Sequence, residues 1–351
     1  MPHGRPLRAP RAWSELTPAW LTTALAGACP GAVVAEAYVA DVAAGTNDRA
    51  RVHLRYRVGS GPERVFVKRE GRWLNRWALT ALGAREAEAR LVAHGPLPLE
   101  SPRLLAGAVD PRRLAAVVVM EDVTLRGAVP GSATVPLTPE QVASGLDGLA
   151  ALHAAHWDRA LPPSLGFVRP WWLGVAWAPV ARAGFVHARH RLRALGRPEL
   201  MPADPATVER GFRGWAGLAR RGPQTLLHGD PHPGNTYALP DGTTGFYDWQ
   251  LVRSGSWAHD VGYFLVSGLA VADRRSHERA LLGGYLAALT SALARRGVAA
   301  PTAGEAWAAY RRTPVFGLGS WLQTLAAGSF QPVEVCLATL ERFAAAYRDL
   351  G

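Results

Sequence analysis

The sequence predicts an α+β protein with a small sheet in its first part and a mainly helical second part. Short alternating segments between Gly- and Pro-rich turns fill the first 120 residues, whereas long segments with helical spacing follow. At 351 residues the chain is long enough for two domains. We therefore expect an N-terminal lobe over 1–120, a linker over 121–135 and a second lobe over 136–351.

The first part is predicted to begin with a helix and to continue as antiparallel strands. Thr17 precedes a proline, which is the pattern of an N-cap followed by proline at the first helical position. The apolar segment 32–42 predicts a strand. Residues 51–58 alternate apolar and polar side chains, which is typical of a half-buried strand. A turn over 59–62 leads to a third strand over 65–69.

The remainder of the first part completes a small, mostly antiparallel sheet. We expect one helix over 79–94 and two further strands near 103–108 and 115–120. The segment 121–134 is rich in Gly and Pro and predicts a linker.

After this linker the sequence has mainly helical patterns. Thr138 and Gln141 form a capping box at the start of a helix. The segments 171–195 and 256–350 also indicate helices.

Charge and composition argue against several protein classes. The net charge is +11, but the arginines are scattered singly or in pairs, so we expect no nucleic-acid partner. No run of 18 apolar residues predicts a membrane span, and the basic N-terminus lacks the apolar core of a secretory signal. Two cysteines cannot form a disulfide framework, so we expect a cytoplasmic location.

One lysine stands out against this background. Lys68, in the stretch VFVKRE, is the only lysine among 39 Lys and Arg residues. Arginine supplies surface charge equally well, but it cannot replace a compact ammonium on a thin stem. The position therefore indicates a site that needs a point charge.

A predicted hairpin carries two candidate metal ligands. Apolar runs over 236–239 and 244–247 flank Pro-Asp-Gly-Thr, which is a turn signature between strands. If the turn holds those four residues, Asn235 lies opposite Asp248 with Cβ atoms roughly 5 Å apart. An amide oxygen and a carboxylate at that separation suit one Mg²⁺ ion.

Asp230 lies five residues before Asn235, on a loop that contains two prolines and a glycine. Such a loop is neither strand nor helix, and it can bend Asp230 back toward the hairpin. A Mg²⁺ site together with a lysine on a separate sheet suits phosphoryl transfer from a nucleotide. The metal would neutralise the phosphates, the lysine would hold them, and a carboxylate would accept the proton of the attacking hydroxyl.

HGDPHPGN followed by DWQ resembles the catalytic loop and metal motif of the aminoglycoside phosphotransferases and of the wider choline-kinase-like and ecdysteroid-kinase-like families. The resemblance covers most of the chain. It implies a two-lobed protein-kinase-like fold with a small antiparallel-sheet N-lobe, which binds the nucleotide, and a mainly helical C-lobe, which binds the acceptor. It also implies ATP as co-substrate and Mg²⁺ as cofactor.

The resemblance also implies roles for individual residues. Asp230 would be the catalytic base, and Asn235 and Asp248 would hold Mg²⁺. Lys68 would contact the phosphates and pair with Glu86, for which Glu88 is the alternative. The further expected positions are Gly45, Thr46 and Asn47 over the phosphates, Glu121 and Val123 in a hinge beside adenine, and His228, His232 and Asp260 supporting the loop.

The acceptor is less well defined by the sequence. From residue 255 onward seven acidic residues stand against nine arginines, which disfavours a highly cationic acceptor. We therefore expect a neutral or weakly charged hydroxyl compound, such as a natural product or an antibiotic. The alternatives are an aminoglycoside O-phosphotransferase that confers resistance, an inactive nucleotide-binding scaffold and a metal hydrolase. GTP is an alternative to ATP, and a monomer or a homodimer is expected.

Overall fold

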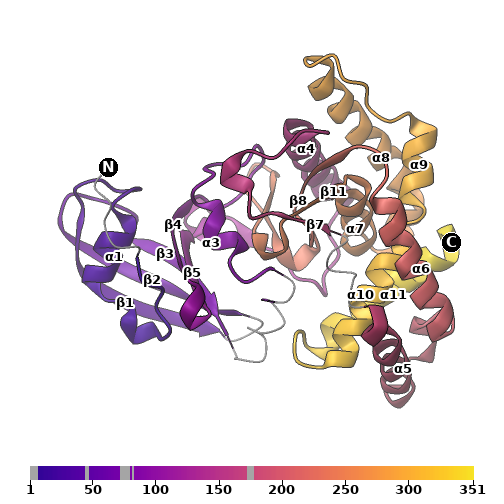
Figure 1. Cartoon of the computed structure of the whole chain (residues 1–351), viewed down its shortest axis with the longest axis horizontal. Coiled ribbons are helices and arrows are strands. Elements are labelled where there is room, and N and C mark those ends of the chain that lie inside the picture. The colour runs from indigo at the N-terminus through magenta and orange to yellow at the C-terminus, as the bar shows by residue number, and fades with distance from the viewer. Residues whose placement is uncertain (1–6, 44–46, 72–79, 81–82, 172–177) are drawn as a thin grey trace. The chain divides into compact units, whose positions relative to one another are not determined.

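The computed structural model describes residues 7–43, 47–71, 80, 83–171 and 178–351 (Figure 1). The chain divides into two compact units. Unit 1 consists of residues 1–96, 102–126 and 162–167, and unit 2 consists of residues 97–101, 127–161 and 168–351. An antiparallel sheet dominates unit 1 and helices dominate unit 2, so the predicted α+β class is confirmed. The assignment of nucleotide and acceptor binding to separate lobes stays a prediction.

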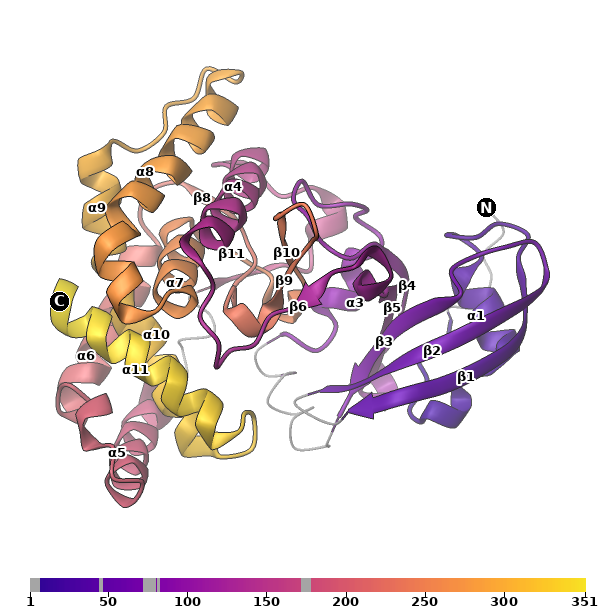
Figure 2. The ribbon, with the colours of Figure 1, turned by 180° about the vertical axis from the view of Figure 1, so that it is seen from behind.

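Unit 1 is built on a five-stranded antiparallel sheet in the order β1-β2-β3-β5-β4 (Figure 2). Its elements are α1 (Pro18–Leu25), β1 (Val33–Ala43), β2 (Asn47–Val58), β3 (Arg64–Glu70), α3 (Ala87–Leu91), β4 (Leu104–Asp110) and β5 (Ala115–Glu121). Each of the five predicted strands is present.

Apolar burial explains how α1 and the sheet hold together. The Thr17 side chain accepts a hydrogen bond from the Trp20 amide and caps α1, as predicted. Leu21 of α1 packs into one cluster with Val52 of β2, and both side chains are fully buried. The alternation of β2 fails only at its end, where Val58 is 52% exposed instead of facing the core.

The predicted helix over 79–94 is much shorter in the described residues. Gly83 has a φ of +65°, which L side chains rarely adopt, and its amide closes a turn on the Thr80 carbonyl. Helix α3 begins only at Ala87, so Glu86 is its N-cap residue and Glu88 lies in its first turn.

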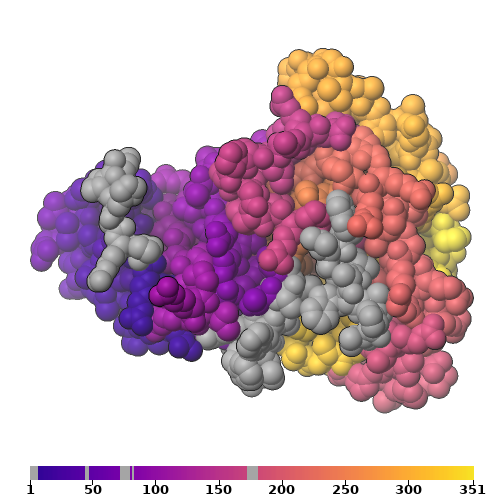
Figure 3. Space-filling view, viewed as in Figure 1, coloured from indigo at the N-terminus to yellow at the C-terminus, as the bar shows by residue number. Residues whose placement is uncertain are grey.

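Unit 2 combines helices with two small three-stranded sheets, in the orders β10-β9-β6 and β7-β11-β8. Figure 3 shows that α8 and α9, in orange, form part of its surface on this face. The strands are β6 (Val129–Pro130), β7 (Arg169–Pro170), β8 (Gln224–Leu227), β9 (Thr236–Ala238), β10 (Thr244–Phe246) and β11 (Arg253–Ser256). The helices are α4 (Pro139–His156), α5 (Ala178–Ala194), α6 (Pro205–Ala219), α7 (Ala258–Gly268), α8 (Val271–Ala294), α9 (Ala303–Tyr310), α10 (Pro314–Ala327) and α11 (Val333–Leu350).

Helix α7 lies at the centre of unit 2. All its residues are buried, and it packs against α4, α8, α9, α10 and α11. The predicted capping box of α4 is present, with the Thr138 side chain and the Gln141 side chain each bonded to the other residue's backbone. The segment predicted as a plain linker also contains β6, which pairs with β9.

Among the described helices, none is long and apolar enough to cross a membrane.

Candidate active site

The loop that follows β8 carries most of the predicted site. At Gly229 the backbone has a φ of +87°, and a Cβ there would overlap the Leu251 carbonyl. Only glycine fits this position, because an L side chain would meet both strain and a clash. The chain can therefore turn sharply between His228 and Asp230.

Asp260 of α7 holds this turn in place by hydrogen bonds to its backbone. Its carboxylate accepts hydrogen bonds from the backbone amides of His228, at 2.6 Å, and Gly229, at 3.0 Å. His153 lies 3.4 Å from the same carboxylate. Burial alone would raise the pKa of Asp260, but the hydrogen bond of His153 and the other interactions that favour the charged carboxylate outweigh it, so the pKa is lowered. The fully buried group therefore acts as a charged acceptor, which is the arrangement expected of a residue that supports the loop.

His228 ties the loop to the strand that precedes Asp248. Its Nε2 lies 3.0 Å from the Tyr247 carbonyl, and its Nδ1 lies 3.3 Å from the Asp230 amide. A neutral imidazole with its proton on Nε2 satisfies both contacts. Burial lowers the pKa of His228, which favours that neutral form.

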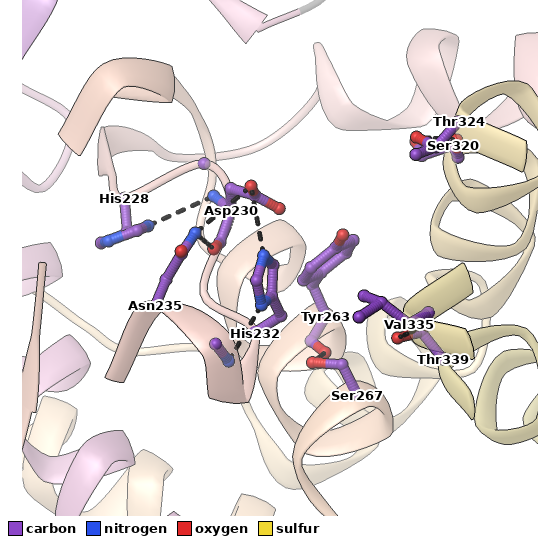
Figure 4. Close-up of polar contacts among 12 residues, drawn as sticks. His228, Asp230, His232, Asn235, Tyr263, Ser267, Ser320, Thr324, Val335 and Thr339 are labelled. Atoms are coloured by element: carbon purple, nitrogen blue, oxygen red, sulfur yellow. Dashed lines mark hydrogen bonds and ion pairs between the residues drawn. The ribbon is translucent and has the colours of Figure 1, made fainter. Parts of the chain in front are cut away.

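Asn235 and His232 lie beside the Asp230 carboxylate (Figure 4). The Asn235 amide nitrogen lies 2.9 Å from the Asp230 carbonyl and 3.3 Å from its Oδ2. The His232 Nε2 lies 3.7 Å from the same Oδ2, and the His232 Nδ1 accepts a bond from the Gly234 amide. The loop thus bends Asp230 back to Asn235, as the sequence predicts.

The predicted hairpin forms, but its predicted register is wrong by one residue. Ala238 faces Thr244, and the Tyr247 amide donates to the Asn235 carbonyl, so Asn235 lies opposite Tyr247 and not Asp248. The turn between the paired residues Ala238 and Thr244 comprises the five residues 239–243, where four were predicted. The Leu239 amide donates to the Thr243 carbonyl, so Leu239 faces Thr243 and not Thr244.

Asp248 leaves the strand in a left-handed conformation with a φ of +65°. The conformation is uncommon for a non-glycine residue and turns the chain away from the pleat. Asp248 directly follows Tyr247, whose carbonyl lies 3.0 Å from the His228 Nε2, so its backbone adjoins the loop.

The oxygen donors of this region fit Mg²⁺ better than a transition metal. Asn235 uses its amide nitrogen on Asp230, which leaves the amide oxygen as its ligand atom. Both ring nitrogens of His228 contact the backbone. In the described part of the chain, no three His, Cys, Asp or Glu side chains gather as a metal site. One amide oxygen and one carboxylate, completed by phosphate oxygens, are a typical Mg²⁺ set.

In unit 1, Lys68 pairs with Glu88 and not with the predicted Glu86. The Lys68 Nζ lies 2.9 Å from the Glu88 carboxylate, and the two side chains are 11% and 6% exposed. Glu86 instead pairs with Arg85 and Arg90. The prediction of Glu86 is wrong because α3 begins after it, so the residue in the first helical turn reaches the sheet.

The other predicted nucleotide contacts receive uneven support. Asn47 lies in β2 opposite Glu70, so it is part of a strand and not of a turn. The Glu121 amide donates to the Arg103 carbonyl and is therefore engaged. Val123 is buried. The predicted contacts at 45–46 lie outside the described residues.

The sequence analysis missed two residues that face the loop from α7. The buried Tyr263 accepts a hydrogen bond from the Trp321 indole nitrogen at 2.8 Å, and burial together with the negative charge of Asp230 raises the pKa of Tyr263 well above its usual value. The His259 Nε2 lies 3.1 Å from the Gly229 carbonyl and 3.0 Å from the Trp171 indole nitrogen. His259 lies one residue before Asp260, and Tyr263 lies three residues after it. This spacing was the only signal in the sequence, because side chains three or four residues apart lie on one face of a helix.

The model of the phosphotransferase enzyme family matches residues 49–300. The chain belongs to this family. A match over that length includes the strand of Lys68, the loop of Asp230 and the hairpin of β9 and β10. The protein is therefore a phosphotransferase.

Solved structures of similar fold accompany the family match. A choline kinase from Cryptosporidium parvum Iowa II is 11% identical, with a TM-score of 0.55 over 90% of this chain and 89% of that chain. A spectinomycin phosphotransferase in complex with ADP and spectinomycin is 11% identical, with a TM-score of 0.51 over 96% of this chain and 100% of that chain. A Plasmodium vivax ethanolamine kinase is 12% identical, with a TM-score of 0.50 over 90% and 83%. A search of curated proteins gave no match. At these identities the similarity establishes the fold, which is the protein-kinase-like fold of the phosphotransferase family.

Proposed function

We propose that this phosphotransferase moves the γ-phosphate of ATP to a hydroxyl group of a small molecule, with Asp230 as the base. The observation that carries the proposal is the position of Asp230 on a loop held by Asp260, with Asn235 bonded to it and with His228 of the same loop 3.0 Å from the carbonyl of Tyr247, the residue before Asp248. In the reaction, the acceptor oxygen forms a bond to the γ-phosphorus as the bond to the ADP oxygen breaks. The hydroxyl proton passes to the Asp230 carboxylate.

The remaining residues would bind and orient the nucleotide. Asn235 and Asp248 would hold Mg²⁺, which would neutralise charge on the phosphate oxygens. Lys68, oriented by Glu88, would bind those oxygens as a point charge. The backbone of Val123 would contact the adenine ring of the nucleotide. GTP is the alternative donor.

We propose a neutral or weakly charged acceptor. Several acidic side chains of unit 2 are already paired with arginines of the same unit. Glu209 lies 2.6 Å from Arg182 and from Arg213. Asp349 similarly pairs with Arg275 at 2.8 Å. Carboxylates engaged in this way are poorly placed to recognise a polycation, which favours a neutral or weakly charged acceptor. An aminoglycoside acceptor, with a role in antibiotic resistance, is the second candidate.

A screen of hydroxyl compounds with Mg²⁺ and ATP tests the function. We expect one neutral compound to gain the mass of a phosphoryl group while ADP is released. Turnover of kanamycin-like compounds as good as that of any neutral alcohol would contradict the proposed acceptor class. Phosphate release without any phosphorylated product would favour a hydrolase.

Asp230→Ala tests the base. We expect turnover to fall roughly 10²–10⁴-fold, the usual contribution of general base catalysis, with nucleotide binding mostly retained. Calorimetric titration with ATP and Mg²⁺ measures the binding and serves as the control for folding. Full activity of the variant would contradict the assignment of Asp230.

A further inference from the structure

The sheet of unit 1 carries a buried carboxylate that the proposed function does not use. Asp122 directly follows β5, and its side chain is 2% exposed. Its Oδ2 accepts hydrogen bonds from the Nε of Arg64, at 2.6 Å, and from the Nε of Arg51, at 3.0 Å. Arg51 belongs to β2 and Arg64 to β3, which lies between β2 and β5 in the sheet (Figure 2). The carboxylate therefore joins the end of β5 to two other strands.

The second carboxylate oxygen holds the segment that follows the sheet, residues 122–125. The Asp122 Oδ1 accepts from the amide of Thr124, at 3.1 Å, and from its hydroxyl, at 2.7 Å. The Thr124 hydroxyl in turn accepts from the Nη2 of Arg64 at 2.8 Å. Burial alone would raise the pKa of Asp122, but the hydrogen bonds of Thr124 and the charges of Arg64 and Arg51 outweigh it, so the pKa is lowered. A charged carboxylate thus fixes the conformation of the segment in the absence of any ligand.

This network lies at one end of the sheet face that carries Lys68. Val65 and Val67 are buried in the core on the other face, so the alternating residues Arg64, Phe66 and Lys68 share the face of the lysine. The rise of a strand places Arg64 roughly 13 Å from Lys68, with Phe66 about halfway between them. An ammonium, an aromatic ring and the ion network therefore follow one another along β3. The same order, from charged phosphates to a planar base, runs along an extended nucleotide.

We propose that Asp122 is a positioning residue for the nucleobase: it ties residues 122–125 to β2 and β3, and thereby holds the backbone of Val123 in the conformation that contacts the base. The inference rests on the proposed binding of ATP along this face. Val123 lies between Asp122 and Thr124, so the hydrogen bonds of its two neighbours fix both of its peptide groups. A backbone that is already ordered lowers the entropy cost of binding. The phosphates gain nothing from this contact, because they would bind at Lys68.

Asp122→Asn keeps the shape of the side chain and removes its charge. One amide oxygen cannot serve both arginines and Thr124, so the segment should lose its fixed conformation. We expect the Kd for Mg²⁺-ATP to rise roughly 10-fold, as for a segment that holds its binding conformation about a tenth of the time. The Kd for Mg²⁺-tripolyphosphate, which has the phosphates but no base, should stay unchanged. Calorimetric titration measures both.

Steady-state kinetics give a second measurement. KM for ATP should rise in Asp122→Asn, whereas kcat at saturating ATP should stay at the wild-type value, because the change affects binding of the base and not the transfer step. Hydrolysis of Mg²⁺-ATP with water as acceptor serves as the reaction.

Thr124→Val is a milder variant that removes the hydroxyl and nearly keeps the shape. It should change the Kd for Mg²⁺-ATP in the same direction by a smaller amount, and it decides the question if Asp122→Asn does not fold. Glu278→Gln is the matched control. Glu278 is a buried carboxylate that accepts from Arg274 and Tyr310 in unit 2, so the variant should leave both affinities unchanged.

Hydrogen exchange makes the test independent of binding and turnover. The amides of residues 122–126 should exchange faster in Asp122→Asn than in the wild type, because the Thr124 amide has lost its charged acceptor. Unchanged exchange, wild-type affinity for ATP, or an equal loss of affinity for ATP and tripolyphosphate would overturn the positioning role. If the wild type binds Mg²⁺-ATP and Asp230→Ala is inactive in that case, the proposed function still stands. If the wild type does not bind Mg²⁺-ATP, the proposed function itself is wrong.

Discussion

The pair of Lys68 and Glu88 places two opposite charges almost out of water. Their atoms are 2.9 Å apart, and both side chains are nearly buried. Burying an ion pair costs desolvation energy that its attraction does not always offset, so such a pair is weak evidence for stability. The proposed role explains it better, because an ammonium that binds phosphate oxygens has to be held in one position.

Glu88→Gln separates the two candidate partners of Lys68. We expect kcat/KM for ATP to fall roughly 30-fold or more, since losing one partner of a buried charge pair costs about 2 kcal/mol or more. Glu86→Gln is the matched control. It breaks pairs with Arg85 and Arg90 only, so its effect should stay below about fivefold. Equal losses in both variants, measured by steady-state kinetics, would contradict the assignment of Glu88.

Residue roles were the hardest part to predict from sequence. The loop residues Asp230 and Asn235 could be predicted because a short segment with Pro and Gly limits where they can lie. The choice between Glu86 and Glu88 depended on where a helix begins, and no cap pattern marks that point. Tyr263 and Trp321 are 58 residues apart. Their contact follows only from the packing of α7 on α10, which periodicity does not encode.

At the scale of elements, the hairpin of β9 and β10 shows what a turn motif predicts and what it does not. Pro-Asp-Gly-Thr correctly predicts a reversal, and Gly242 has the expected positive φ of +87°. The register depends on one further hydrogen bond, between Leu239 and Thr243. Because side chains alternate along a strand, this shift of one residue moves Asp248 out of the predicted pairing. The left-handed backbone conformation of Asp248 then changes the direction of the chain at this residue.

The packing around two helical glycines predicts that Gly→Ala substitutions change the stability of the protein in opposite directions. A Cβ at Gly317 of α10 would overlap the ring of Phe343 in α11. Gly317→Ala should therefore destabilise the protein by about 1–3 kcal/mol, despite the better helix propensity of alanine. At Gly283 of α8 a Cβ would meet no atom within 4 Å, so Gly283→Ala should stabilise by up to about 1 kcal/mol. Urea unfolding measures both, and a stabilising Gly317→Ala would contradict the close packing of α10 on α11.

At the scale of the whole molecule, the two units differ in how they use charge. Unit 2 buries the histidines and Asp260 that support the loop of Asp230, whereas the described part of unit 1 buries Asp122 with Arg51 and Arg64 and Glu88 with Lys68. The division into two units was predictable, because alternating patterns and helical patterns occupy different parts of the sequence. The sequence did not predict that residues 97–101 belong to unit 2 and residues 162–167 to unit 1, because segments this short have no periodicity.

Buried histidines make the stability of the fold depend on pH. Burial lowers the pKa of His259, so the unfolded chain binds a proton more readily than the folded one. The free energy of unfolding should therefore be highest above about pH 6.5 and fall as the pH drops below it, by at most about 1.4 kcal/mol per pH unit for this group. His259→Gln should flatten the decline, and the exposed His277→Gln should leave it unchanged. Urea midpoints from pH 8 to 5 provide the measurement, and identical slopes in all three proteins would contradict the effect.

The solitary lysine has a practical consequence. Apart from the α-amino group, an amine-acylating reagent would find a single side chain to modify, and that side chain lies beside Glu88. Its labelling rate, followed by intact mass, would report nucleotide occupancy in the unaltered protein, with neither an engineered tag nor knowledge of the acceptor.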